Sequence, residues 1–212
     1  MKTKIIFTAD DAGILPQIDN AIVDLANRGI LNSAEVLPNY GNEGDKSIYN
    51  AKQIITQIKT SGNPLELGVH LTITSGSPIT QSGGLDPLRD EQGRFRSYRD
   101  IPSNADPEAL YQELKAQAEI LLSNDTLRPY ITHLTNHHDA LWFYPEYTLA
   151  LVRLADELNF TIRNTRTIPE SKGWIYYVFQ NLLRGISQAD KNKIKDAYNL
   201  RADGYLPKQP LK

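Results

Sequence analysis

The chain has 212 residues, which is long enough for one substantial hydrophobic core, so we expect a single domain over residues 1–212. Its 23 basic and 25 acidic residues give a formal net charge of −2, and this balance provides no electrostatic footprint for nucleic acid or an anionic membrane surface. Cysteine is absent, which excludes disulfides, thiolate ligands and cysteine nucleophiles and leaves Asp, Glu and His as metal-binding side chains.

Short apolar runs alternate with segments in which apolar residues recur at helical spacing. The runs that we expect to be strands are 4–8, 33–37, 65–72, 130–134 and 160–163. The segments that we expect to be helices are 16–28, 45–59, 107–122, 146–158 and 188–198. This alternation predicts an α/β fold in which a parallel sheet or barrel is covered by helices.

A long polar connection at 76–106 precedes the helix with the clearest boundary signals. Asp106 is placed to cap that helix, and Pro107 suits its first turn. Connections of this length are uncommon in compact domains unless they are functional or disordered. Two interpretations therefore stay open: a flap-like loop over a functional site, or a mobile insertion without a role.

Acidic and histidine side chains stand where three of the apolar runs end. Asp10 and Asp11 follow the first run, His70 lies near the end of the third, and the fourth run is followed by His137 and His138. Strand ends in α/β proteins meet at a common edge, so we expect these side chains to converge. Two imidazoles and one carboxylate leave coordination positions open for water, a pattern that indicates a metallohydrolase.

Adjacent carboxylates beside a cation can divide their work, and we assign Asp11 to the metal and Asp10 to the role of general base. The alternative is an Asp-Asp-Ala-Gly turn whose carboxylates cap the next helix. Zinc favours this ligand mix, whereas magnesium prefers oxygen ligands. The sequence lacks a G-x-S-x-G nucleophile elbow and a G-x-x-x-x-G-K-[ST] phosphate loop, so serine hydrolase and nucleotide chemistry have no support.

The histidines also have structural interpretations. His70 alone could be a hydrogen-bonded core residue, because an unsatisfied buried imidazole would cost about 1–3 kcal/mol. His133 and His137 are four residues apart and would face the same side of a strand, while His138 would face the other side. The metal hypothesis therefore depends on all three strand ends together.

Three segments of the chain resemble the YdjC-like carbohydrate deacetylases: TADDAGILPQIDNAIVDLANRGILNSAEVLPN, LGVHLTITSGSPI and ITHLTNHHDALWFYPEY. The resemblance implies a distorted, TIM-like (β/α) barrel. It also implies a metal-dependent hydrolase that removes acetyl groups from N-acetylated amino sugars or oligosaccharides. By position it implies Asp11, His70 and His137 as metal ligands and Asp10 as the base, with one divalent cation that is usually described as magnesium.

The chain departs from the common pattern of this family at one segment. Where relatives usually have Asp-Ser-His-His-His, this chain has Thr-Asn-His-His-Asp, and no histidine follows His138. His138 is therefore the nearest candidate for the general acid. Five strands are too few for a closed barrel, so we expect one that is incomplete or truncated at the C-terminus. The second hypothesis is a carbohydrate-binding or regulatory protein that keeps the metal site without catalysis.

Arg96 and Trp142 are candidate substrate contacts, the latter because aromatic faces suit sugar rings. Arg163 could bind substrate or pair with a carboxylate, and we favour the pairing. No stretch approaches the roughly 20 apolar residues of a membrane span, and the first apolar run is too short for a signal-peptide core. We expect a cytoplasmic protein with a small-molecule or oligosaccharide substrate and without nucleic-acid or membrane partners, and a homodimer stays open.

Overall fold

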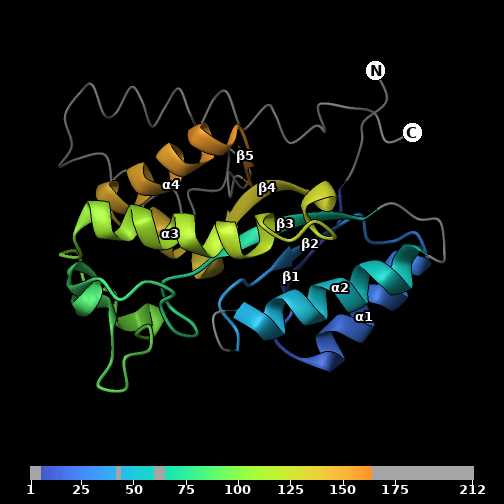
Figure 1. The fold of residues 1–212 in the computed structure, drawn as a ribbon, viewed down its shortest axis with the longest axis horizontal. Helices are drawn as coiled ribbons and strands as arrows, with labels where there is room; N and C mark the ends of the chain where they lie inside the picture. The colour runs from blue at the N-terminus through green and yellow to red at the C-terminus, as the bar shows by residue number, and fades with distance from the viewer. Residues whose placement is uncertain (1–5, 42–43, 60–64, 164–212) are drawn as a thin grey trace, which may run out of the picture.

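The computed structural model describes residues 6–41, 44–59 and 65–163, which form a five-stranded parallel sheet in the order β1-β2-β3-β4-β5 (Figure 1). The strands are β1 (Thr8–Ala12), β2 (Ser33–Val36), β3 (Glu66–Leu71), β4 (Ile131–Asn136) and β5 (Thr161–Ile162). The helices are α1 (Pro16–Asn27), α2 (Asp45–Lys59), α3 (Pro107–Leu122) and α4 (Pro145–Leu158). The predicted α/β class is confirmed.

Consecutive strands are neighbours, and right-handed crossovers then place the connecting helices on one face of the sheet. Figure 1 shows α1 and α2 side by side near the first strands, and α3 and α4 side by side near the last ones. This sequential order is also that of the strands in a (β/α) barrel.

The strand boundaries differ from expectation by more than one residue in two strands, the first and the fourth. The first strand was expected at 4–8, but β1 runs from Thr8 to Ala12, and residues 1–5 lie outside the described part. The fourth was expected to end at Leu134, but β4 continues to Asn136. The two residues of β4 beyond the expected end, Thr135 and Asn136, are polar yet buried. A search for apolar runs therefore does not include them in the strand. The helix expected at 188–198 also lies outside the described residues.

The two faces of the sheet carry different side chains. Alternate positions such as Val36, Val69 and Leu134 belong to the apolar core that also holds Leu110 and Leu151 of the helices. The intervening positions, which face the other side, hold Ser33, Glu35, Gly68, His70, His133 and Thr135. Apart from Gly68, which has no side chain, all the residues in this second set have buried side chains. Buried polar groups need partners, so these residues must bond to one another or to a ligand.

The α3 helix begins as the sequence predicts. The side chain of Asp106 accepts a hydrogen bond from the backbone N–H of Ala109 at 2.7 Å, and Pro107 occupies the first helical position. Leu110 and Leu114 lie fully buried on one face. The predicted capping of this helix by Asp106 is confirmed.

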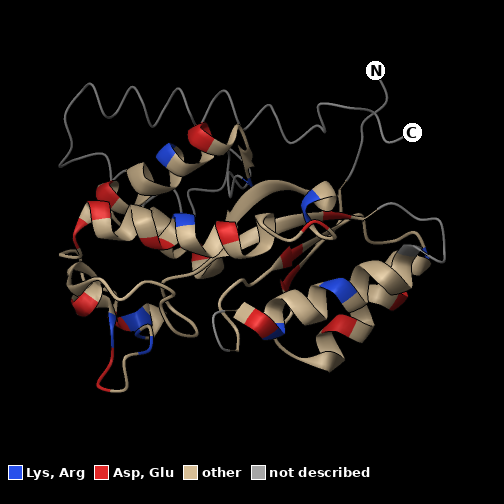
Figure 2. Cartoon of the chain, in the orientation of Figure 1, with Lys and Arg blue, Asp and Glu red and all other residues tan. Residues whose placement is uncertain are grey.

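The connection at 76–106 contains the short 3₁₀ helices η2 (Gly83–Leu88) and η3 (Tyr98–Asp100). Leu85, Leu88 and Phe95 are buried in the core, so the segment has apolar anchors of its own. Figure 2 shows its basic residues interspersed with acidic ones. Arg89 and Arg94 each pair with an aspartate of the same segment, at 3.0 and 3.1 Å.

None of the helices in the described ranges has the length and apolar content that a membrane span requires.

Candidate metal centre

The end of β1 bends so that Asp11 leaves the regular strand path. The pairing of β1 with β2 is regular at Thr8 and Ala9 and shifts before Ala12, and Asp11 has a left-handed φ of 64°. Aspartate tolerates this conformation better than most residues do. Bulges of this kind commonly re-aim a side chain beside a functional site.

The turn that follows is held by a different aspartate. Asp19 of α1 accepts a hydrogen bond from the backbone N–H of Gly13 at 2.8 Å. The N-cap of α1 is Leu15, which makes no side-chain capping bond. Asp10 and Asp11 therefore do not cap α1, and the interpretation of these residues as a capping turn is wrong.

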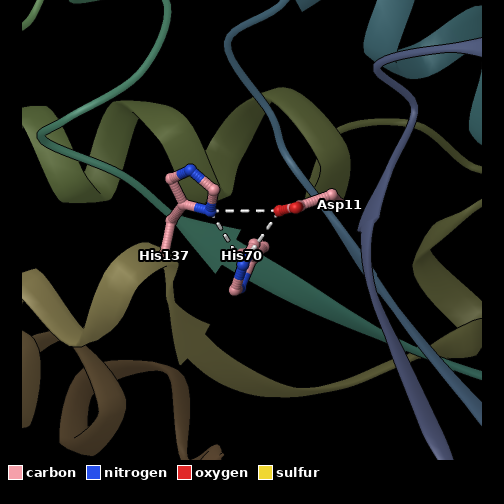
Figure 3. Close-up of side chains that lie close together, drawn as sticks. All are labelled: Asp11, His70 and His137. Carbon is pink, nitrogen blue, oxygen red and sulfur yellow. Dashed lines mark hydrogen bonds and ion pairs between the residues drawn. The ribbon is translucent and has the colours of Figure 1, made fainter. Parts of the chain in front are cut away.

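Asp11, His70 and His137 converge from two strands and a 3₁₀ helix (Figure 3). Asp11 lies in β1 and His70 in β3, while His137 opens the 3₁₀ helix η5 (His137–Trp142) directly after β4. Oδ1 of Asp11 lies 3.0 Å from Nδ1 of His137 and 3.4 Å from Nε2 of His70. The two ring nitrogens are 3.3 Å apart. Three potential ligand atoms thus form a small triangle at the C-terminal edge of the sheet.

This triangle has the dimensions of one face of a metal coordination shell. Ligand atoms about 2.1 Å from one cation are about 3.0 Å apart at an octahedral angle and about 3.4 Å apart at a tetrahedral angle. The observed separations span 3.0–3.4 Å. Oδ1 of Asp11 is buried and makes no well-aligned hydrogen bond among the described residues, so its lone pairs are available. These three residues fit a divalent cation and do not discriminate magnesium from zinc.

The two imidazoles also set the charge state of Asp11. Interactions with His137 and then His70 hold the pKa of the Asp11 carboxyl well below its usual range and outweigh the opposing effect of burial. An ionised carboxylate between two imidazoles is the state that a cation requires of its ligands.

His138 lies beside the triangle. Its backbone is left-handed, with a φ of 57°, and its Nδ1 is 3.1 Å from Oγ1 of Thr74. Its ring centroid is 3.7 Å from that of His137 and 4.9 Å from that of Tyr98 in the 76–106 connection. Burial, followed by the charge of His137, lowers the pKa of His138.

Asp10 and Arg163 pair with each other. Both terminal nitrogens of Arg163 donate to the Asp10 carboxylate, one of them at 2.9 Å. A second carboxylate, that of Glu35, lies 3.9 Å from Nη1 of Arg163. The structure therefore contains the carboxylate pairing that we favoured for Arg163.

Two other predicted residues, Arg96 and Trp142, are not part of the ligand triangle. Arg96 is exposed, and its Nε donates to the carbonyl of Pro87 at 3.0 Å. Trp142 is buried within η5. Contacts of Arg96, Trp142 and Arg163 with a substrate stay predictions.

The prediction that His133 and His137 face the same side of one strand is wrong, because β4 ends at Asn136 and His137 belongs to η5. His133 lies within β4, where its Nε2 is 2.9 Å from Oε1 of Glu35. Its role in the structure is that of a partner for a buried carboxylate.

Sequence reasoning missed Glu35 and Thr135, which lie between His133 and His70. A usable signal was present: Glu35 stands in the middle of a short apolar run, where a charged side chain must have partners if the run is buried. Thr135 carried no distinguishing signal.

A parallel α/β sheet that gathers one carboxylate and two imidazoles at the C-terminal ends of its strands defines a protein with a candidate metal centre. The chain belongs to the YdjC-like protein family, whose model matches residues 4–207. The expected family membership is confirmed.

Curated relatives include carbohydrate deacetylase 1 of Listeria innocua, which is 38% identical over 139 residues, covering 64% of this chain and 51% of the relative. The carbohydrate deacetylase of Vibrio cholerae is 31% identical over 163 residues, covering 76% of this chain and 58% of the relative. The chain thus spans about half the length of these relatives.

A solved structure from Enterococcus faecalis V583, described as a candidate cellobiose-phosphate cleavage protein, matches with a TM-score of 0.64 and 24% identity. The match covers 84% of this chain and 64% of the other. At this identity the likeness supports the fold alone.

Proposed function

We propose that this protein is a metal-dependent carbohydrate deacetylase that hydrolyses the acetamide bond of N-acetylated amino sugars or oligosaccharides. The observation that carries the proposal is the convergence of Asp11, His70 and His137 within hydrogen-bonding distances of one another. The names of the curated relatives support the same reaction.

Asp11, His70 and His137 would hold one divalent cation, either magnesium or zinc. Such a cation, when bound, polarises the attacked carbonyl and lowers the pKa of water. The remaining chemistry belongs to side chains of the chain itself.

Asp10 is the proposed general base. Its carboxylate adjoins the ligand Asp11 in sequence and is oriented by the two-pronged contact from Arg163. In its ionised form a carboxylate accepts a proton from the attacking water.

His138 is the proposed general acid. Its Nδ1 lies next to Thr74, which orients the ring. In the proposed reaction, water adds to the acetamide carbonyl, the C–N bond breaks, and the leaving amine takes a proton from His138 as acetate forms.

The proposal also includes the 76–106 connection as a flap-like loop beside the site. The contact between the rings of Tyr98 and His138 supports this placement. We propose Arg96, Trp142 and Arg163 as substrate contacts. We also propose the cytoplasm as the location of the protein. Light scattering would determine whether the protein forms a homodimer.

The test measures acetate release from N,N′-diacetylchitobiose by protein that has been stripped with a chelator and then reloaded with Mg²⁺ or Zn²⁺. We expect release from the reloaded protein, and we expect His70→Ala and His137→Ala to lose both tight metal binding and release. Asp11→Asn should likewise lose tight metal binding, and Asp24→Asn, at an exposed position of α1, is its control. Unchanged metal content in both histidine variants would contradict the proposal.

The alternative is a protein that binds metal and sugar without catalysis. Sugar-dependent heat in calorimetry, together with no acetate release under any metal condition, would favour this alternative over the deacetylase.

A further inference from the structure

We propose that Glu35 is a positioning residue of the metal centre, which acts through Thr135 to fix the tautomer and the orientation of His70. The inference rests on the proposed function in one respect, namely that His70 is a metal ligand. It extends that function to residues of β2 and β4 that contribute no ligand atom themselves.

A continuous chain of hydrogen bonds connects Glu35 with the triangle. Oε2 of Glu35 lies 3.2 Å from Oγ1 of Thr135, and the same hydroxyl lies 2.7 Å from Nδ1 of His70. The other ring nitrogen of His70, Nε2, faces Asp11 and His137 at 3.4 and 3.3 Å. This chain of hydrogen bonds from Glu35 through Thr135 to His70, which we call the relay, begins inside the sheet and ends at the candidate ligand atom Nε2 of His70.

Glu35 is a fully buried carboxylate that is surrounded by donors. Nε2 of His133 donates to it at 2.9 Å, the Ser33 hydroxyl donates at 3.2 Å, and Arg163 lies 3.9 Å away. Burial raises the pKa of Glu35, but His133 and Arg163 lower it, and the net result lies below its ordinary value. The ionised carboxylate can only accept hydrogen bonds.

The direction of every bond in the relay follows from this. The hydroxyl of Thr135 has one proton, and its two acceptors are Oε2 of Glu35 and the carbonyl of Val69 at 3.5 Å. Neither acceptor can donate, and the hydroxyl directs its one proton at Oε2 of Glu35, so the Thr135 oxygen accepts from Nδ1–H of His70 in the proposed relay. His70 then carries its proton on Nδ1, and the lone pair of Nε2 is directed at the metal position.

The sheet leaves space for this arrangement at Gly68. Gly68 pairs with Glu35 on one side and with His133 on the other. A Cβ atom at position 68 would lie 1.8 Å from Oε2 of Glu35 and 2.6 Å from Nε2 of His133. A residue with any side chain would therefore displace the carboxylate from its place in the relay.

Partners of this kind tune the metal centre without touching the ion. A hydrogen bond to the second nitrogen of a ligating histidine fixes its tautomer and raises its basicity, and its loss commonly costs about 10–100-fold in metal affinity. We expect a loss of that size when the relay is broken at either Glu35 or Thr135.

The experiment compares Thr135→Val, Glu35→Gln and Thr135→Ser with the wild type. Zinc affinity is measured by competition with a chromogenic chelator, and the His70 tautomer is read from ¹⁵N chemical shifts of the imidazole in the metal-free protein. Thr148→Val is the matched control, because Thr148 is a buried threonine that bonds to the carbonyl of Leu141 and does not contact His70.

We expect Thr135→Val and Glu35→Gln to bind zinc about 10–100-fold more weakly and to lose the pure Nδ1–H tautomer of His70. Thr135→Ser restores the hydroxyl and should recover both readouts, while Thr148→Val should leave both unchanged. Melting temperatures of the metal-free variants separate loss of folding from loss of positioning.

Wild-type affinity and an unchanged His70 tautomer in both Thr135→Val and Glu35→Gln would overturn the inference. If the wild type binds no cation, the proposed function fails. In that case the tautomer in the metal-free protein still decides whether Glu35 controls His70.

Discussion

Glu35 shows how single residues on the inner face of the sheet depend on one another. It is fully buried, and the donors Ser33, His133 and Thr135 satisfy its carboxylate. Removing one donor from such a group costs more than the average hydrogen bond contributes, because the remaining charge stays desolvated. The inner face is therefore sensitive to changes that would be mild on a solvated surface.

Gly68→Ala should destabilise the protein by about 1–3 kcal/mol, because the added methyl overpacks the space occupied by Glu35 and His133. Urea denaturation provides the measurement. Gly83→Ala is the control, since a Cβ atom there would meet only Asp86 at 3.7 Å. The control should change the free energy of unfolding by no more than about 0.5 kcal/mol. Equal stability of the two variants would contradict the packing at Gly68.

Asp19→Asn should stabilise the protein at pH 7. Burial raises the pKa of Asp19 above its ordinary 3.8, and the hydrogen bond from Gly13 offsets this only in part. A raised pKa in the folded state favours folding at low pH, and this contribution is lost as the pH rises through the folded-state pKa. Asparagine keeps an acceptor for Gly13 without the buried charge.

Melting temperatures at pH 7 and at pH 3.5 check this expectation. The advantage of Asp19→Asn over the wild type should shrink at the lower pH, where both side chains are mostly uncharged. Asp24→Asn on the exposed side of α1 should show neither effect. A variant that melts below the wild type at pH 7 would show that the Asp19 charge is favourable.

At the scale of secondary-structure elements, side chains of α3 form hydrogen bonds with the backbone of the chain that follows β3. Gln117 exchanges two bonds with the backbone of Thr72, at 2.9 and 2.8 Å. Glu113, one turn earlier, accepts from the backbone N–H groups of Ile79 and Thr80 at 2.9 and 2.7 Å. The helix therefore anchors the chain that leaves β3 and passes Thr74, the contact of His138.

Glu113→Leu should loosen the chain after β3, because the N–H groups of Ile79 and Thr80 lose their acceptor in a partly buried place. Hydrogen exchange at these two amides should accelerate, while amides in β4 should be unaffected. Glu119→Leu, at an exposed position of the same helix, should leave exchange at both amides unchanged. Slow exchange in Glu113→Leu would mean that other bonds hold this segment.

Local patterns predicted the order of strands and helices because apolar spacing and capping are properties of neighbouring residues. Asp106 could be identified as a cap from its position before Pro107 alone. The extent of β4 could not be predicted in this way, since Thr135 and Asn136 look like loop residues until their buried partners are known. The boundaries of the strands depend on contacts between distant segments.

The same distinction applies to the candidate site. Asp11, His70 and the pair His137–His138 were candidates because each stands near the end of an apolar run, and the resemblance to the YdjC-like family implied His137 as the ligand. Glu35 was missed because its partners His133 and Thr135 are about 100 residues away in the chain. No local spacing encodes that cluster, which exists only once β2, β3 and β4 are paired.

For the molecule as a whole, a cation at the ligand triangle would connect β1, β3 and the segment after β4. Binding to the folded state alone stabilises a protein in proportion to the logarithm of ligand concentration. A cation bound at this candidate centre would therefore link metal supply to the stability of the sheet.

Zinc or magnesium at 100 times its dissociation constant should raise the free energy of unfolding by about 2.7 kcal/mol, and a chelator should reverse the gain. Thermal denaturation with and without the cation checks this. Asp11→Asn should lose most of the gain, whereas Asp24→Asn should keep it. Identical melting curves for the wild type under both conditions would exclude a tightly bound ion.

The wide spacing of the three candidate ligands along the chain has a consequence for protein synthesis. Translation delivers Asp11 first and His70 much later, and His137 leaves the ribosome only after the whole of α3. A nascent chain therefore cannot offer a complete binding site until most of the sheet has emerged. Metal capture should consequently follow the synthesis of β4, and free zinc or magnesium should not accelerate the earliest folding of α1 and α2.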